Sequence, residues 1–156
     1  MAPRYDLGPH TRTISTDSSE AQTWFDLGLN WSYAFSHDEA FRCFERVVEL
    51  DPGCAMGHWG MAYATGPYYN GPWERMPAPQ RRDMNERAHR YIQQALRHLD
   101  STSDIERGLV EAYAQRVQEP ANDDFEVFAR WDDAYAQAMS ELAALHPDDD
   151  DVAALA

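Results

Sequence analysis

The sequence contains no lysine, and all 13 of its basic residues are arginine. This excludes mechanisms that need a lysine Schiff base or a lysine bound to phosphate. Long apolar runs are also missing: no stretch approaches the roughly 18–20 apolar residues of a membrane-spanning helix. Residues 1–20 have no apolar signal-peptide core, and two cysteines, Cys43 and Cys54, are too few for a disulfide framework. These absences predict a cytoplasmic protein with reduced thiols and no membrane partner.

Acidic residues outnumber basic ones by 27 to 13, which gives a formal net charge of −14. Such a surface repels phosphate backbones, so nucleic acid is not expected as a partner. A basic protein, a cationic ligand or a metal ion is easier to accommodate. The sequence also lacks a serine-nucleophile elbow, a phosphate-binding glycine loop and a CxxC pair. It therefore favours a binding protein over a self-contained enzyme.

A helical period is present between residues 21 and 50. Apolar or small residues recur there at three- and four-residue steps on both sides of a turn at Ser36-His37. Pro52 then ends the second helix, because proline cannot continue the hydrogen-bond ladder. The spacing resembles the 34-residue tetratricopeptide repeat, a hairpin of two antiparallel helices. Six positions agree with that repeat, namely Trp24, Leu27, Gly28, Ala40, Phe44 and Pro52.

Two further units follow with wider spacing. The second opens at Ala55, and its second helix is marked by Ala88, which lies 48 positions after Ala40 and so 14 more than one repeat. The third contains Leu109 and ends near Pro147. We therefore expect an all-α, antiparallel helix-pair solenoid of about three repeats, two of them with expanded hairpins.

The repeats divide the chain into three parts. Residues 1–20 are expected to form an extended N-terminal segment, residues 21–147 the tetratricopeptide-repeat domain, and residues 148–156 the start of a further repeat helix. A solenoid needs polar capping elements at its ends. We therefore expect a fragment of a longer protein, or a homo-oligomer that covers the exposed solenoid edge.

Four short motifs carry a narrower resemblance. They are His37-Asp38-Glu39-Ala40, Cys54-Ala55-Met56, Trp59-Gly60 and Gly66-Pro67-Tyr68-Tyr69-Asn70. The segment that holds them resembles a group of bacterial and fungal repeat proteins of uncertain function. Gly71 departs from that group, whose members more often have lysine there. The resemblance implies a native protein of several hundred residues and supplies no reaction.

The resemblance also implies that the first helix of each pair lines a concave groove. In the first two units the groove positions are largely aromatic and apolar, which suits a peptide, a protein segment or a small apolar ligand. Only Arg107 is basic among all the groove positions, and this disfavours a clamp for a peptide carboxylate. The alternative is that these side chains are ordinary core packing. The candidate ligand-binding residues here are Phe25, Leu29, Tyr33, Trp59 and Tyr63.

The loop at residues 66–79 is rich in proline and aromatic residues. Proline lowers the entropy that a loop loses on ordering, so we expect this loop to pack back onto the helices. It then acts either as a ligand-binding lid or as a lid that completes the core. Its prolines are Pro67, Pro72, Pro77 and Pro79, and its candidate ligand-binding residues are Tyr68, Tyr69 and Trp73.

Two polar clusters remain as candidates. The hairpin topology places His37, Glu39 and Asn70 at the same end of the helices, where they could orient a ligand or hold a divalent metal. The alternative is that His37 caps its helix and Asn70 bonds its own turn. Cys54 and His58 are four apart on one helical face, a pair that suits zinc or copper. The alternative for Cys54 is a buried thiol.

Three hypotheses follow. The first is a scaffold that binds a peptide, a protein or a small apolar ligand in the aromatic groove. The second is a metal-dependent or ligand-processing enzyme that uses one of the two polar clusters. The third is an assembly module that self-associates through its solenoid edge.

Overall fold

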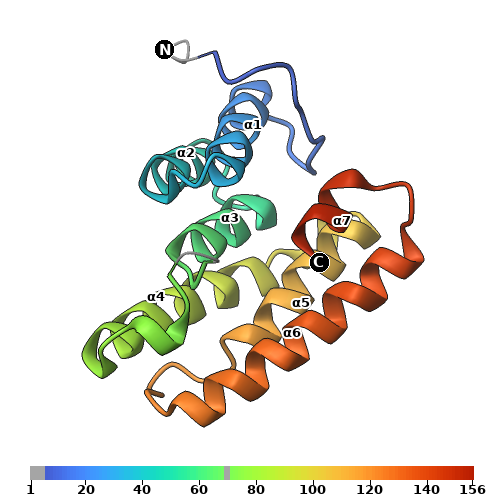
Figure 1. Cartoon of the computed structure of the whole chain (residues 1–156). Coiled ribbons are helices and arrows are strands. Elements are labelled where there is room, and N and C mark those ends of the chain that lie inside the picture. The colour runs from blue at the N-terminus through green and yellow to red at the C-terminus, as the bar shows by residue number, and fades with distance from the viewer. Residues whose placement is uncertain (1–5, 69–70) are drawn as a thin grey trace.

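The computed structural model describes residues 6–68 and 71–156, and these residues contain α-helices and short 3-10 turns but no strand (Figure 1). The prediction of an all-helical chain is therefore confirmed for the described part. The α-helices are α1 (Ser19–Tyr33), α2 (His37–Leu50), α3 (Ala55–Thr65), α4 (Ala78–Leu96), α5 (Asp104–Arg116), α6 (Phe125–Leu145) and α7 (Asp150–Leu155); the 3-10 turns are η1 (Trp73–Arg75) and η2 (Leu99–Ser101).

Side-chain caps explain where most of the helices begin. The Ser18 hydroxyl accepts a hydrogen bond from the Ala21 amide and starts α1, two residues earlier than the sequence pattern predicts. Ser103 forms a reciprocal capping box with Glu106 at the start of α5. Such caps satisfy amides that have no partner inside the helix.

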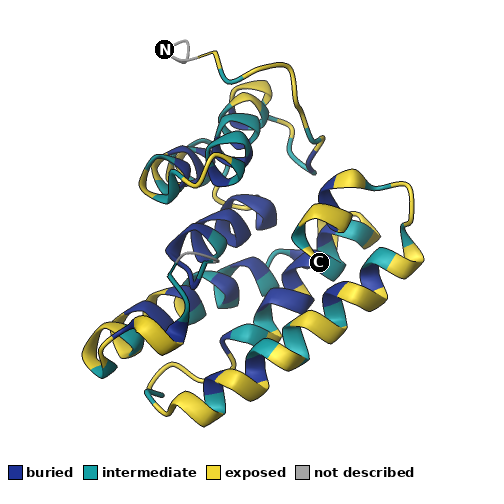
Figure 2. Ribbon diagram, viewed as in Figure 1, coloured by how far each residue is buried: buried dark blue, intermediate teal, exposed yellow. Residues whose placement is uncertain are grey.

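Neighbouring helices pack in pairs, α1 with α2, α3 with α4 and α5 with α6, and α3 also packs against α2. Phe44 on α2 is fully buried where these helices approach most closely. A Cβ atom on Gly28 would lie 2.7 Å from the Phe44 ring, and one on Gly60 would lie 2.3 Å from it. Glycine is therefore required at both positions. Figure 2 shows that α3 is the most deeply buried helix.

The proline-rich segment between α3 and α4 packs onto the helices. Trp73 is 1% exposed and stacks on Phe128 of α6, with ring centroids 4.3 Å apart. Together with Met76, Met84 and Trp131 these rings form a second, smaller core cluster. The cluster lies against the N-terminal part of α6, which begins at Phe125 with Asp124 as its N-cap.

The described N-terminal residues 6–18 run without helix alongside α1 until α1 begins. The chain returns to this segment at its other end, where α7 lies beside it (Figure 1). Within the described residues, no helix has both the length and the apolarity to cross a membrane.

Candidate functional site

Three of the five predicted groove residues lie in the main core. Phe25, Leu29 and Trp59 are 0%, 1% and 2% exposed, so in this structure they do not line an open groove. Tyr33 and Tyr63 are half-buried, and Tyr63 stacks on Trp59 with centroids 5.2 Å apart. The burial of Phe25, Leu29 and Trp59 therefore corrects the expectation that they line an open groove, because other parts of the chain cover them.

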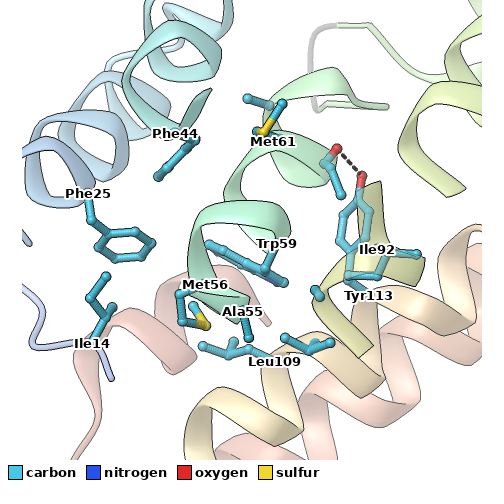
Figure 3. Packing of buried hydrophobic residues seen from close by; sticks show 14 of the residues in the cluster. Ile14, Phe25, Phe44, Ala55, Met56, Trp59, Met61, Ile92, Leu109 and Tyr113 are labelled. Atoms are coloured by element: carbon cyan, nitrogen blue, oxygen red, sulfur yellow. Dashed lines mark hydrogen bonds between the residues drawn. The ribbon is translucent and has the colours of Figure 1, made fainter. Parts of the chain in front are cut away.

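Ile14 is the residue that covers the Phe25 side of this core. Its side chain is 5% exposed and belongs to the same cluster, and Figure 3 shows it pointing toward Phe25 with Met56 nearby. Ile14 lies in the middle of residues 10–16, which we call the N-terminal strap. The strap thus lies where the sequence predicts a ligand.

The backbone of the strap is held by side chains of α1. The Gln22 side-chain amide donates to the Arg12 carbonyl at 2.8 Å, and its oxygen accepts from the Ile14 amide at 3.0 Å. The Asp26 carboxylate accepts from the Arg12 amide at 2.9 Å. Burial raises the pKa of Asp26, although the Arg12 amide and Gln22 oppose the shift. Gln22 therefore binds two backbone groups of one extended segment at once.

The Arg12 guanidinium is bound by two carboxylates of α7 and its N-cap. Its Nη1 donates to Asp149 at 2.8 Å and to Asp151 at 3.2 Å. The three side chains are only 10%, 17% and 9% exposed, respectively. Burial alone would lower the pKa of Arg12 and raise that of Asp149, but the ion pair outweighs it in both cases. Tyr33 also donates to Asp151 at 2.6 Å.

Hydroxyl groups of the strap bind two further carboxylates. The Ser15 amide donates to Glu106 at 2.6 Å, and the Ser15 hydroxyl donates to the second oxygen of the same carboxylate. Glu106 is 2% exposed. The Thr16 hydroxyl donates to Asp51 at 2.6 Å. At the other end of the strap, the His10 ring lies 2.8 Å from Asp151.

The predicted cluster at the end of α1 is only partly assembled. His37 stacks on Tyr68 with ring centroids 3.7 Å apart, and burial lowers the pKa of His37. Glu39 instead pairs with Arg42, three residues further along α2. Tyr69 and Asn70 lie outside the described residues. The structure thus joins His37 to Tyr68 and gives Glu39 a different partner.

The predicted metal pair is embedded in the fold. Cys54 is 1% exposed, and burial raises the pKa of its thiol to about 11. His58 has Nε2 3.0 Å from the Pro52 carbonyl, to which it donates, and its ring stacks on His98. In the described part of the chain, no group of three His, Cys, Asp or Glu side chains is arranged to hold a metal ion. Zinc or copper at Cys54 and His58 therefore lacks a third ligand.

An open groove of about 430 Å³ lies between α5 and α6, away from the end of the solenoid that was expected to self-associate. Its lining includes small residues of both helices, Gly108, Ala112 and Ala138, and the acidic residues Glu111 and Glu141. A second copy placed there would oppose like charges, which disfavours self-association through this groove.

A scan against protein-family models and searches of the curated proteins and of the solved structures find no match for this chain. The site is therefore interpreted from its own geometry. That geometry is built on residues that the repeat pattern does not mark. Of the predicted ligand-binding residues, Tyr33 takes part by donating to Asp151. The partners of the strap lie on α1, α5 and α7, at the N-cap residue Asp149 and at Asp51 after α2.

Proposed function

We propose that this chain is a binding scaffold of the tetratricopeptide type and that its ligand is an extended peptide segment. The observation that carries the proposal is the way residues 10–16 are held. Side chains of α1 bind backbone amides and a carbonyl of the strap. The side chains of the strap itself lie at separate polar and apolar positions. Repeat scaffolds bind extended segments through such combinations of backbone and side-chain contacts.

A peptide fits this surface better than a small apolar ligand. The aromatic residues expected to bind an apolar molecule, Phe25 and Trp59, are buried beneath the surface. The groups that face the strap are instead side-chain amides and carboxylates. They are spaced to match the backbone groups of an extended peptide. Gln22 alone bonds the Arg12 carbonyl and the Ile14 amide, groups that any extended chain presents.

The surface residues are held in place by their own helices. Asp149 caps α7 by accepting the Val152 amide at 2.9 Å, and Glu106 accepts the Ser103 amide at 2.8 Å in the α5 capping box. Gln22 donates to Asp26, one turn away on α1, at 3.0 Å. None of these bonds involves the strap. A preorganised surface lowers the cost of binding a ligand.

The test uses the full chain with the strap displaced by R12E and I14D. A fluorescent peptide with the sequence of residues 8–17 is titrated into this variant and followed by anisotropy. We expect saturable binding with one peptide per chain, whereas a scrambled peptide of the same composition should not bind. Circular dichroism checks that the variant is folded. A folded variant that binds neither peptide would refute the proposal.

A further inference from the structure

We propose that the strap is an intramolecular competitor, and that the scaffold recognises a basic partner segment with the pattern arginine, any residue, aliphatic residue, hydroxyl residue. This inference rests on the proposed function. In the strap, the pattern is filled by Arg12-Thr13-Ile14-Ser15. The partner is therefore another protein that presents an extended segment of the same chemistry.

Alternation along the strap shows which positions are recognised. Arg12 is largely covered and Ile14 is buried, whereas Thr11 and Thr13 are exposed. In an extended chain, successive side chains point to opposite sides, so residues two apart face the same surface. The scaffold thus contacts the side chains of Arg12 and Ile14 and leaves Thr11 and Thr13 free to vary. The chain bends at Ser15, where the hydroxyl meets Glu106.

The arginine position is selective because of its two carboxylates. Asp149 and Asp151 both accept from the Arg12 guanidinium in a largely buried setting. A guanidinium presents several N–H donors in a rigid plane, and it is more weakly hydrated than an ammonium group. A lysine at this position would offer one compact charge with a larger cost of burial. A neutral residue would leave two neighbouring carboxylates without their cation.

The hydroxyl position is selective because Glu106 is buried. Both carboxylate oxygens of Glu106 accept from Ser15, one from its amide and one from its hydroxyl. A serine or threonine of a partner can supply the same pair of donors. A phosphate on that hydroxyl would place at least one further negative charge against a buried carboxylate, so phosphorylation of the segment should abolish binding.

Charge identifies the partner as basic. The surface around the strap is acidic, with Asp26, Asp51, Glu106, Asp149 and Asp151 all bonded to strap atoms. The whole chain has a formal net charge of −14. Additional arginines or lysines at the exposed positions of a partner segment would speed association and favour it over neutral segments.

The covalent link to the scaffold gives the strap an advantage over a free partner. A short flexible tether corresponds to an effective concentration of about 1 mM. If the same segment binds in trans with a dissociation constant of about 100 µM, the molecules with a bound strap outnumber those with a detached strap by about ten to one. The apparent affinity of a partner is then about 10-fold weaker than its affinity for the open surface.

The experiment titrates a labelled peptide of residues 8–17 into the wild-type full chain and into the R12E/I14D full chain. We expect the variant to bind about 10-fold more tightly than the wild type. In the peptide, replacing Arg12 by Gln, Ile14 by Ala, or Ser15 by phosphoserine should each weaken binding at least about 5-fold. The matched controls are peptides with Thr11 or Thr13 replaced by Ala, which should bind like the parent peptide.

The outcomes separate this inference from the proposed function. If the parent peptide binds but the Arg12 replacement costs nothing, the recognition pattern is wrong and peptide binding still stands. If a folded variant binds no peptide, both proposals fail. Equal affinity of wild type and variant would overturn the competition. Light scattering that shows wild-type dimers dissociated by the peptide would instead assign the surface to the strap of a second copy.

Two further variants protect the test against misfolding. R12Q alone removes the strap guanidinium and keeps Ile14, so it should strengthen peptide binding with less risk to the fold. In the R12E/I14D background, D149N keeps an N-cap residue on α7 while removing one charge. It should reduce the preference for the arginine peptide over its glutamine version at least about 5-fold. An unchanged preference would exclude Asp149 as the arginine contact.

Discussion

The replacement I14A tests whether the strap is a fixed part of the core or a segment that detaches. Ile14 is 5% exposed and sits in the main hydrophobic cluster beside Phe25. Truncating a buried isoleucine to alanine at a fixed core position costs about 2–5 kcal/mol of the free energy of unfolding. For comparison, F44A removes a fully buried ring between three helices and should cost about 3–5 kcal/mol.

A detachable strap sets an upper limit on the cost that I14A can show. If molecules with a bound strap outnumber those with a detached strap by about ten to one, docking of the strap contributes about 1.4 kcal/mol to the free energy of unfolding. The cost of I14A at a fixed position exceeds that value, so the variant should release the strap rather than keep a cavity. The loss of unfolding free energy should therefore level off near 1.4 kcal/mol. I14D should lose the same amount, because the released side chain is in water in both variants.

Urea unfolding followed by tryptophan fluorescence gives these free energies, and amide hydrogen exchange shows where they act. We expect the Ile14 and Ser15 amides to lose protection in I14A, while amides of α3 change only by the global loss. A detachable strap is excluded if I14A lowers the free energy of unfolding by more than about 3 kcal/mol, or if I14D lowers it far more than I14A. Either result would make the strap a permanent part of the core.

Three other predictions address the close packing at Gly60 and the buried side chains of Cys54 and His58. G60A should lower the free energy of unfolding by about 1–3 kcal/mol, because its Cβ would overlap the Phe44 ring. The control is G53A at an exposed turn, where a Cβ would lie 3.6 Å from the nearest oxygen of Asp51. Urea unfolding should show little change for G53A. The Cys54 thiol, with a pKa of about 11 and 1% exposure, should resist alkylation at about pH 8 until urea unfolds the chain, as mass spectrometry would show. Burial lowers the pKa of His58 below 6.5, so the unfolded chain takes up the proton first as the pH falls. The contribution of His58 to stability is therefore complete above about pH 6.5 and is lost below it. A fall in Tm between about pH 7 and pH 5 that H58N reduces would support this; an identical fall in H58N would contradict it.

Local patterns predicted the helices well because a helix is specified by neighbours in sequence. The small and apolar positions Gly28, Ala40 and Phe44 recur at helical spacing, and the structure packs all three between α1 and its neighbours. The start of α1 was less exact: the pattern begins at residue 21, whereas the Ser18 cap starts the helix at Ser19.

The strap could not be predicted because its contacts join distant parts of the chain. Ser15 binds Glu106 across 91 positions, and Arg12 binds Asp149 across 137 positions. One apolar residue, Ile14, gives no periodic signal. Residues 148–156 were expected to begin a further helix, and α7 lies there with Asp149 as its N-cap. The burial of Asp151, which is 7% exposed, was not expected. Phe25 was marked as a groove position, and the segment that covers it was not predicted.

Glu106 explains why the hydroxyl position should discriminate between partner segments. A carboxylate that is 2% exposed is costly unless its oxygens accept hydrogen bonds, and Ser103 and Ser15 supply the donors. When the strap leaves, water replaces Ser15, so the open surface keeps Glu106 solvated. A partner segment with alanine at this position would cover Glu106 without supplying the hydroxyl. The Ser103 amide and the partner's own amide still bond the two oxygens, so the loss is one hydrogen bond to a buried charged group. Such a bond contributes about 1.5–3 kcal/mol, which corresponds to about 10- to 150-fold weaker binding. The buried carboxylate thus rejects segments that match the arginine and the aliphatic residue alone.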